Sequence, residues 1–220
     1  MRNVFLIALM LPVHLVHADG PQIDLNDIPV TANPFSLAND ELVSPTYIMN
    51  GITLQNNKDS SIGNMLDKVP GISNSSWGDS VGRPTIRGMD RNRIKILNNG
   101  MEIRDVSSMS GDHAIGLDGL AAEQIEVIKG PETILYGGGA VGGVINIIDY
   151  RIHPEFIEGV IGNYNVSAGG ANNAKAGAVL LDVGAGNIMY HVDLYNRDTK
   201  NLKIPGFSVS KRLADSDAEF

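Results

Sequence analysis

The sequence of 220 residues contains no cysteine. Disulfide frameworks, thiolate metal sites and cysteine nucleophiles are therefore excluded, and the absence suits a protein exported to an oxidising compartment. Basic residues are also in the minority, with 17 Lys and Arg against 25 Asp and Glu. The chain thus lacks the cationic excess that nucleic acid attracts, and we expect no nucleic-acid binding. The hydrophobic fraction of 43% is ordinary for a folded protein.

A long apolar run occurs only near the amino terminus. Arg2 is followed by an almost wholly apolar stretch at residues 4–16, and Val16 and Ala18 supply aliphatic or small side chains at the −3 and −1 positions of a cleavage site. This pattern predicts a secretory signal peptide at residues 1–18. The stretch is too short for a retained anchor, and nothing after Ala18 approaches a transmembrane helix. Contact with a bilayer would therefore need β-strands.

Residues 19–47 are polar, rich in Asn and Pro, and show no sustained period, which predicts an extended arm. The arm contains one short β-prone island. Such an island can add itself as a strand to the sheet edge of a partner, although an ordinary linker explains the same residues. The island consists of Asp27, Ile28, Pro29, Val30, Thr31 and Ala32.

Residues 48–153 mix short strands with short helices, which predicts a small α+β domain. Ser60 or Ser61 can cap a helix that ends before residues 70–71, and further short helices are expected at 117–124 and 131–136. The Asn99-Gly100 pair predicts a hairpin turn. Strands are expected at 84–88, 94–97, 101–105, 125–129 and 144–148.

The glycine-rich residues 137–143 contain a formal G-x-G-x-x-G. A dinucleotide fingerprint opens a helix, whereas these glycines precede a β-branched run, so we expect no nucleotide site. No nucleophile, base and orienting group occur together, and the sequence does not predict an enzyme or a catalytic cofactor.

From residue 158 onward apolar and polar residues alternate over about ten positions, the reach of a tilted membrane strand. Soluble β-sandwiches alternate in the same way. His191 and Asp193 stand two apart and so share one strand face, which would be the lumen of a barrel. They are therefore weaker candidates for metal contacts.

Four segments, at residues 66–72, 85–89, 124–131 and 135–148, together resemble the plug of TonB-dependent outer-membrane receptors in order and spacing. The resemblance implies an α+β plug domain, with a small mixed sheet and short helices, at residues 48–153. Residues 154–220 would then be the first antiparallel strands of an incomplete outer-membrane β-barrel surrounded by lipid. It also implies that the TonB energy transducer contacts the arm, with residues 27–32 as the TonB box.

The same resemblance assigns plug–barrel charges to Arg87, Glu126 and Lys129. The family usually carries arginine before the Gly-Pro pair, where this chain has Lys129. Lysine lacks the planar fork that pairs bidentately with carboxylates, so an ion pair there should be looser. The alternative is that these charges hold the plug itself together.

Asp112 and His113 form the most suggestive chemical pair, because a carboxylate and an imidazole are ordinary Zn²⁺ ligands. Two ligands do not complete a zinc shell, and a solvated loop pair is the alternative. The Asp-His-Ala sequence is similar to that of zinc-uptake receptors of the family, which implies zinc as the transported substrate. Haem or a ferric siderophore remains the alternative cargo, since an imidazole also binds haem iron.

An isolated periplasmic plug that binds metal without transporting it is a further possibility. Residues after 153 suffice for only three or four strands of about ten residues, whereas a closed barrel needs many more. We therefore do not expect this chain alone to transport.

Overall fold

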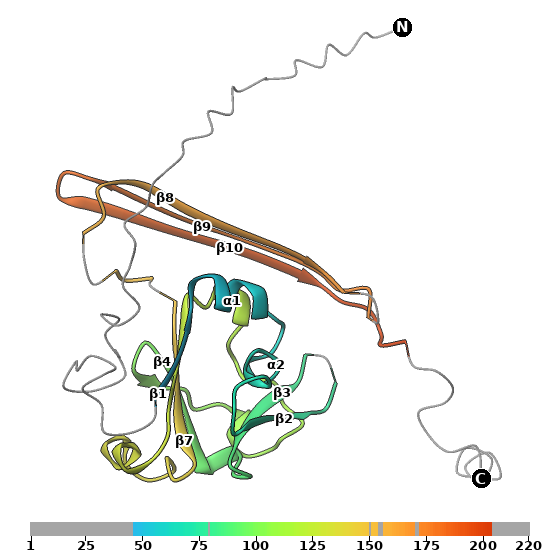
Figure 1. Cartoon of the computed structure of the whole chain (residues 1–220). Coiled ribbons are helices and arrows are strands. Elements are labelled where there is room, and N and C mark those ends of the chain that lie inside the picture. The colour runs from blue at the N-terminus through green and yellow to red at the C-terminus, as the bar shows by residue number, and fades with distance from the viewer. Residues whose placement is uncertain (1–45, 79, 150, 154–155, 170–171, 204–220) are drawn as a thin grey trace, which may run out of the picture.

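The computed structural model describes residues 46–203, except residues 79, 150, 154–155 and 170–171 (Figure 1). The expected signal peptide and the island at residues 27–32 lie outside the described residues. Within the described part, no helix is both long and apolar enough to cross a membrane.

A five-stranded mixed sheet forms the centre of the plug, with the strand order β1-β6-β7-β4-β5. β4 pairs with β7 in parallel, and the other neighbours are antiparallel. Every residue of β6 and β7 is buried, which suits the Val and Ile side chains that make up most of both strands. The strands are β1 (Thr46–Asn50), β4 (Ile94–Asn98), β5 (Met101–Glu102), β6 (Gln124–Ile128) and β7 (Gly143–Ile148).

Two short helices and a two-stranded ribbon cover the sheet. The helices are α1 (Gly51–Asn57) and α2 (Ile62–Leu66), and the ribbon pairs β2 (Ile72–Ser76) with β3 (Gly82–Ile86). Ser61 caps α2 as expected, because its side chain accepts a hydrogen bond from the Asn64 backbone N–H at 3.1 Å. Apolar side chains of α2 then join the main core, which contains Ile62, Met65, Leu66, Ile86, Ile125, Val127, Ile145 and Ile147.

Several expectations for the plug need correction. The segments expected as helices at 117–124 and 131–136 form only 3₁₀ turns, η5 (Gly119–Ala121) and η6 (Pro131–Tyr136). η6 ends where Gly137 takes a positive φ of 76°, and η5 ends because Ala122 is already extended toward β6. The sheet also begins earlier than residue 48, since Thr46 pairs with Ile128.

The hairpin turn at residues 99–100 is confirmed, with φ of 48° at Asn99 and 79° at Gly100. The strand that follows is shorter than expected. β5 ends at Glu102, and one further backbone bond joins the Ile103 N–H to the Ile96 carbonyl of β4 at 3.0 Å. Asp105 then accepts from the Ser107 N–H and starts the 3₁₀ turn η4 (Val106–Ser108). A further 3₁₀ turn, η3 (Arg91–Arg93), precedes β4.

A second sheet of three long antiparallel strands lies across the end of the plug near α1 (Figure 1). It consists of β8 (Gly159–Ala168), β9 (Lys175–Ala185) and β10 (Ile188–Asp198), in the order β10-β9-β8. We call this sheet the wall. The expected period of two is confirmed: one face of the wall is exposed and apolar, and the other faces the plug and is mostly polar, with Ala178 and Leu180 buried on it. The exposed side chains include Tyr164, Val179, Leu181, Tyr190, Val192 and Leu194.

Candidate functional site

The loop between η4 and η5 carries Asp112 and His113, and both side chains are open to solvent, at 56% and 52% exposure. His113 Nδ1 lies 2.9 Å from Asp112 Oδ1, and Ser110 Oγ donates to the same carboxylate. These hydrogen bonds, the one from Ser110 foremost, hold the pKa of Asp112 below its ordinary value. The carboxylate is therefore ionised at neutral pH and is accessible to a cation.

Asp105 braces this loop at both ends. Its carboxylate accepts from the Ser107 N–H at 3.0 Å and from the Gly116 N–H at 2.8 Å. Burial acts to raise the pKa of Asp105, but the hydrogen bonds from Ser107 and Gly116 outweigh it and keep that pKa below the ordinary value. The loop that presents His113 is thus closed by a single ionised side chain.

Exposed apolar groups lie beside the loop. A Cβ placed on Gly111 would lie 3.7 Å from Trp77 Nε1 and 3.6 Å from Arg91 Nε. Trp77 is 68% exposed and Met109, four residues before His113, is 83% exposed. An exposed indole and thioether next to the Asp112–His113 pair offer contact area for an organic ligand.

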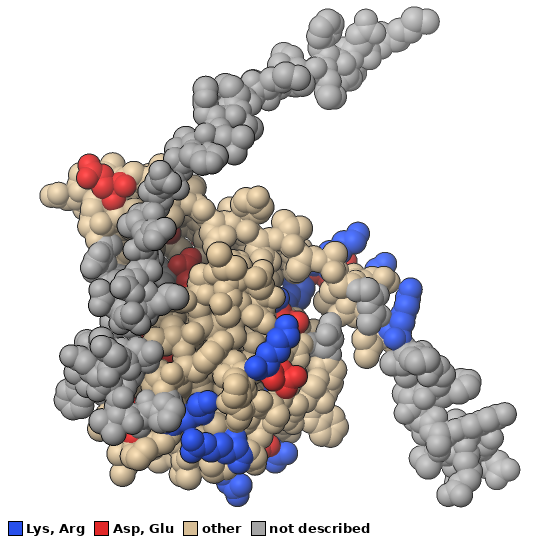
Figure 2. Space-filling view, viewed as in Figure 1, with Lys and Arg blue, Asp and Glu red and all other residues tan. Residues whose placement is uncertain are grey.

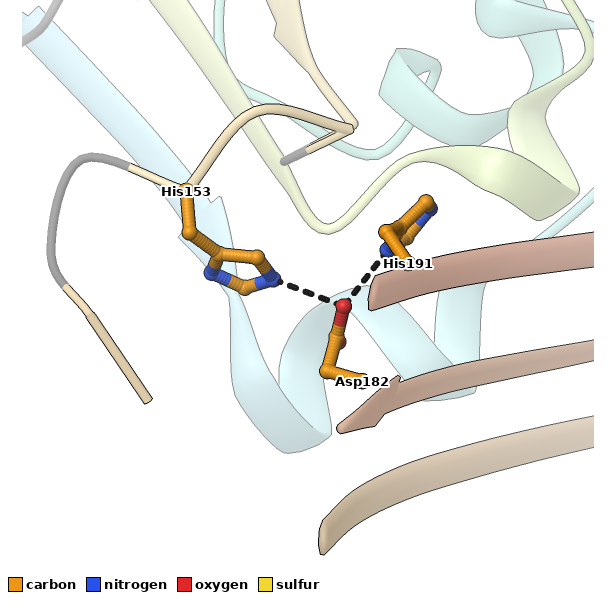
Figure 3. Close-up of side chains that lie close together, drawn as sticks. All are labelled: His153, Asp182 and His191. Carbon is orange, nitrogen blue, oxygen red and sulfur yellow. Dashed lines mark hydrogen bonds and ion pairs between the residues drawn. The ribbon is translucent and has the colours of Figure 1, made fainter. Parts of the chain in front are cut away.

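A second cluster lies between the plug and the wall (Figure 3). Asp182 Oδ1 on β9 lies 2.6 Å from His191 Nδ1 on β10 and 3.1 Å from His153 Nε2, in the segment between β7 and β8. All three side chains are at least 85% buried. His191 was expected to face the lumen, and it does face the plug. His153 and Asp182 were not expected in any site.

Asp193 does face the plug beside His191, but its partner is different. Its carboxylate lies 3.4 Å from an Arg151 Nη atom, and Arg151 Nε also lies 3.3 Å from Asp149. Among the described residues, the group of possible metal ligands contains His191 but not Asp193. Asp193 therefore serves an ion-pair network that joins the wall to the end of β7.

Glu123 approaches the His153–Asp182–His191 cluster from the plug. Burial raises the pKa of Glu123, and the nearby Asp182 carboxylate raises it further. His153, Lys58 and His191 act in the opposite direction. Glu123 thus shares its electrostatic environment with all three members of the cluster.

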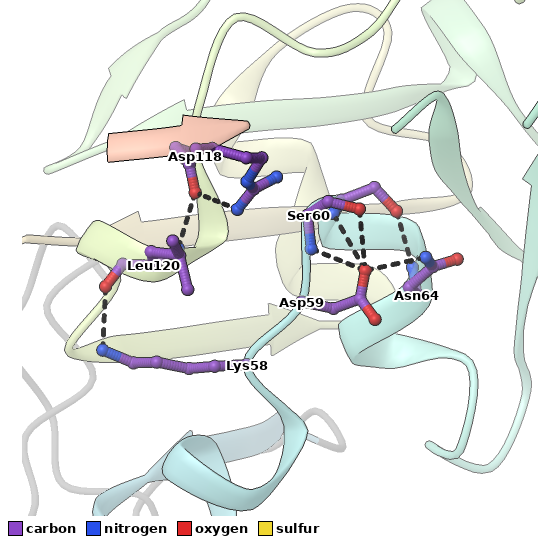
Figure 4. A network of polar contacts seen from close by, with 8 residues as sticks. Lys58, Asp59, Ser60, Asn64, Asp118 and Leu120 are labelled. Atoms are coloured by element: carbon purple, nitrogen blue, oxygen red, sulfur yellow. Dashed lines mark hydrogen bonds and ion pairs between the residues drawn. The ribbon is translucent and has the colours of Figure 1, made fainter. Parts of the chain in front are cut away.

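Further polar contacts link the plug and the wall near η5 (Figure 4). Arg197 on β10 donates to Asp118 at 2.9 Å. Within the plug, Lys58 Nζ donates to the Leu120 carbonyl at 2.8 Å, and Asp59 accepts from the Asn64 side chain at 2.8 Å. The Arg197–Asp118 pair therefore joins the wall to a plug segment that its own hydrogen bonds hold in place.

The three expected plug–barrel charges occupy different environments. Glu126 is fully buried inside the plug, where Gln124 and Asn146 donate to it at 2.8 and 3.0 Å. Its position therefore corrects the expectation of a charge open to barrel partners and fits the alternative of a bond within the plug.

Arg87 is exposed and Lys129 is half-buried. Burial lowers the pKa of Lys129, and the nearby positive charge of Arg87 lowers that pKa further. Lys129 Nζ donates to the Pro70 carbonyl at 3.1 Å. In the described part of the chain, neither cation has a carboxylate at ion-pair distance, so both are available to an acidic partner. Figure 2 shows Lys and Arg side chains gathered at the end of the plug away from the wall.

Comparison with known proteins agrees with this architecture. Residues 38–144 match the family described as the TonB-dependent Receptor Plug Domain. The vitamin B12 transporter BtuB of Vibrio vulnificus (strain CMCP6) is 31% identical over 177 residues, which cover 78% of this chain and 27% of that protein. The match to a plug confirms the fold class expected from the sequence.

Solved structures share the fold. The ferric-catecholate import receptor Fiu of E. coli K12 has a TM-score of 0.59 at 22% identity, over 80% of this chain and 24% of that chain. The copper transporter OprC has a TM-score of 0.57 at 25% identity, over 72% of this chain and 24% of that chain. The chain thus spans about a quarter of the length of these relatives. Their names refer to vitamin B12, ferric catecholates and copper, and the expected likeness to zinc-uptake receptors stays a prediction.

Proposed function

Because residues 38–144 are the plug domain of a TonB-dependent receptor, we propose that the protein serves the energised uptake of a scarce metal, most simply zinc. Its location is the bacterial outer membrane, where receptors of this family reside. The observation that carries the metal proposal is the exposed, ionised Asp112 beside His113 on a loop braced by Asp105. A carboxylate and an imidazole are favourable first contacts for Zn²⁺.

The plug loop supplies two ligands, and a zinc shell takes about four. Water or side chains from elsewhere in the receptor complete it. An open, two-ligand contact suits a cargo site, because a transported ion has to leave again. A closed four-ligand shell of the structural kind would retain it.

Release needs the plug to move against the wall. The contacts between them include the Arg197–Asp118 ion pair and the ion pair between Arg151, just after β7, and Asp193 on β10. Polar contacts of this kind can be exchanged for water at little net cost, unlike a continuous apolar core. We therefore assign the driving force to TonB, which would pull on the arm at residues 27–32, outside the described residues.

A metal chelate such as haem or a ferric siderophore is the second candidate cargo. Trp77 and Met109 favour it, because both are largely exposed beside the Asp112–His113 loop. An aromatic ring and a thioether stabilise an organic ligand by stacking and apolar contact, which a bare Zn²⁺ ion cannot use.

The test compares His113→Ala with Trp77→Ala in the full-length receptor. If zinc is the cargo, His113→Ala weakens Zn²⁺ binding by at least about tenfold and slows zinc-limited growth, whereas Trp77→Ala changes neither. If a chelate is the cargo, Trp77→Ala reduces growth on that chelate. Unchanged Zn²⁺ affinity and unchanged zinc-limited growth in His113→Ala would overturn the zinc proposal.

Deleting residues 27–32 separates a receptor from a soluble metal-binding module. In a TonB-driven receptor the deletion abolishes zinc-limited growth and leaves Zn²⁺ binding at Asp112 and His113 intact. Growth that is indifferent to the deletion would contradict the assignment of residues 27–32 as the TonB contact.

A further inference from the structure

We propose that His153, Asp182 and His191 bind a divalent transition-metal ion, in a site between plug and wall that is separate from the cargo contact at Asp112 and His113. The three residues come from the β7–β8 connection, β9 and β10. The site rests on its own geometry and goes beyond the proposed uptake function.

The ligand atoms are already gathered. One ligand atom from each residue lies within 4.8 Å of the other two. Atoms bound to a tetrahedral ion at about 2.0 to 2.1 Å lie roughly 3.3 Å apart. The contacts of 2.6 Å and 3.1 Å to Asp182 are therefore close to the required spacing, and side-chain rotations alone would admit the ion.

Hydrogen bonding leaves part of the cluster unsatisfied. A single oxygen of Asp182 faces both imidazoles, and His191 Nε2 is buried with no hydrogen-bond partner within the described part of the chain. A buried ring nitrogen without a partner is unfavourable. A cation between the three side chains would bind the ring nitrogens that face Asp182, so that the two imidazoles no longer share one carboxylate oxygen.

The cluster offers two imidazoles and one carboxylate, a set that selects a borderline ion such as Zn²⁺ or Co²⁺. Glu123 is not among the three grouped residues, but it lies near enough for the charges of Asp182 and both histidines to act on it. Ca²⁺ and Mg²⁺ prefer shells made of oxygen and are disfavoured here.

The position of the cluster separates it from the cargo contact. The β9–β10 turn has two residues, 186–187, whereas the β8–β9 connection has six, 169–174. Short turns mark the periplasmic end of an outer-membrane sheet. Asp182 and His191 flank the short turn, so the site lies at the periplasmic end and ties the segment that carries His153 to the wall.

The experiment uses the full-length receptor with His113→Ala, so that the cargo contact is absent. After chelation of bound metal, Zn²⁺ alone is titrated by calorimetry, and Co²⁺ alone is followed by its visible absorption. We expect one remaining site with the absorption of a nitrogen- and oxygen-bound ion. Adding Asp182→Asn, His153→Gln or His191→Gln should weaken it by at least about tenfold.

Asp193→Asn is the matched control, because it removes a carboxylate two residues from His191 on the same face while leaving the cluster intact. His153 lies outside the strands, so His153→Gln tests the site even if a strand variant fails to fold. The proposal is overturned if the His113→Ala receptor binds no Zn²⁺ at micromolar concentration, or if His153→Gln binds as tightly as its parent. Loss of zinc-limited growth does not enter this test, so uptake and the second site can fail independently.

Discussion

Arg197 on β10 donates to Asp118 of the plug at 2.9 Å, and the two side chains are only 17% and 20% exposed. The same carboxylate accepts from the Leu120 backbone N–H at 2.9 Å and so caps η5. One side chain therefore orders a plug turn and joins that turn to the wall. Because the pair is largely shielded from water, its loss should be measurable, unlike that of an exposed ion pair.

Arg197→Ala is expected to destabilise the plug against the wall by about 2 kcal/mol, since it leaves a partly buried carboxylate with one partner fewer. Arg197→Lys, the control, keeps the charge and should lose less. Thermal unfolding of the full-length protein in detergent measures both. Combined with Asp118→Asn in a double-mutant cycle, additive effects would show that the two side chains are not coupled.

Two glycines of the glycine-rich residues 137–143 should differ in how strongly substitution by alanine destabilises the plug. A Cβ on Gly143 would lie 2.6 Å from Ile86 Cδ1 and 3.1 Å from the Ile128 carbonyl oxygen, whereas a Cβ on Gly138 meets nothing within 4 Å. We expect Gly143→Ala to cost about 1 to 3 kcal/mol through overpacking and Gly138→Ala to be near neutral. Equal melting temperatures for the two variants would contradict the view that close packing requires glycine at position 143.

Asn99 has two roles in the hairpin after β4. Its φ of 48° suits the tight turn, and its side chain donates to Asp149 at 2.6 Å and accepts from the Asp149 N–H at 3.2 Å. Asn99→Ala should therefore cost about 1 to 3 kcal/mol, while Asn99→Asp keeps the turn and the accepting oxygen but places two carboxylates together. Chemical denaturation at neutral and at acidic pH distinguishes these effects. If the loss of unfolding free energy in Asn99→Asp is as large at acidic pH as at neutral pH, repulsion from Asp149 is excluded as its cause.

Much of the plug follows from local sequence signals. The Ser61 cap, the turn at residues 99–100 and the strand near 144–148 each depend on residues close in sequence, and the structure has all three. Other elements were not predicted. β1 and β2 have little local signature, because β1 becomes a strand through pairing with β6 and β2 through pairing with β3.

The second metal site escaped prediction for a similar reason. His191 was recognised by its strand face, but Asp182 on β9 was not singled out, and His153 lies in a connection with no period. Their convergence depends on antiparallel register, which places Asp182 opposite His191, and on the return of the chain from β7. A signal was present, since His153 is one of three histidines after residue 18, but spacing alone did not group it with the others.

Glu123 should make stability depend on pH. Burial and the neighbouring Asp182 raise its pKa in the folded protein, so the folded state holds a proton that the unfolded state has already released. The free energy of unfolding therefore falls as pH rises from the ordinary glutamate range to the raised folded value, and it levels off above that value. Glu123→Gln, which cannot titrate, should lose this dependence and be the more stable protein at neutral pH once chelator has removed divalent metal. Unfolding midpoints of the parent and of Glu123→Gln are measured from pH 4 to pH 8, with Asp193→Asn as the control. If the midpoints of the parent and of Glu123→Gln change with pH in parallel, Glu123 is not the source of the pH dependence.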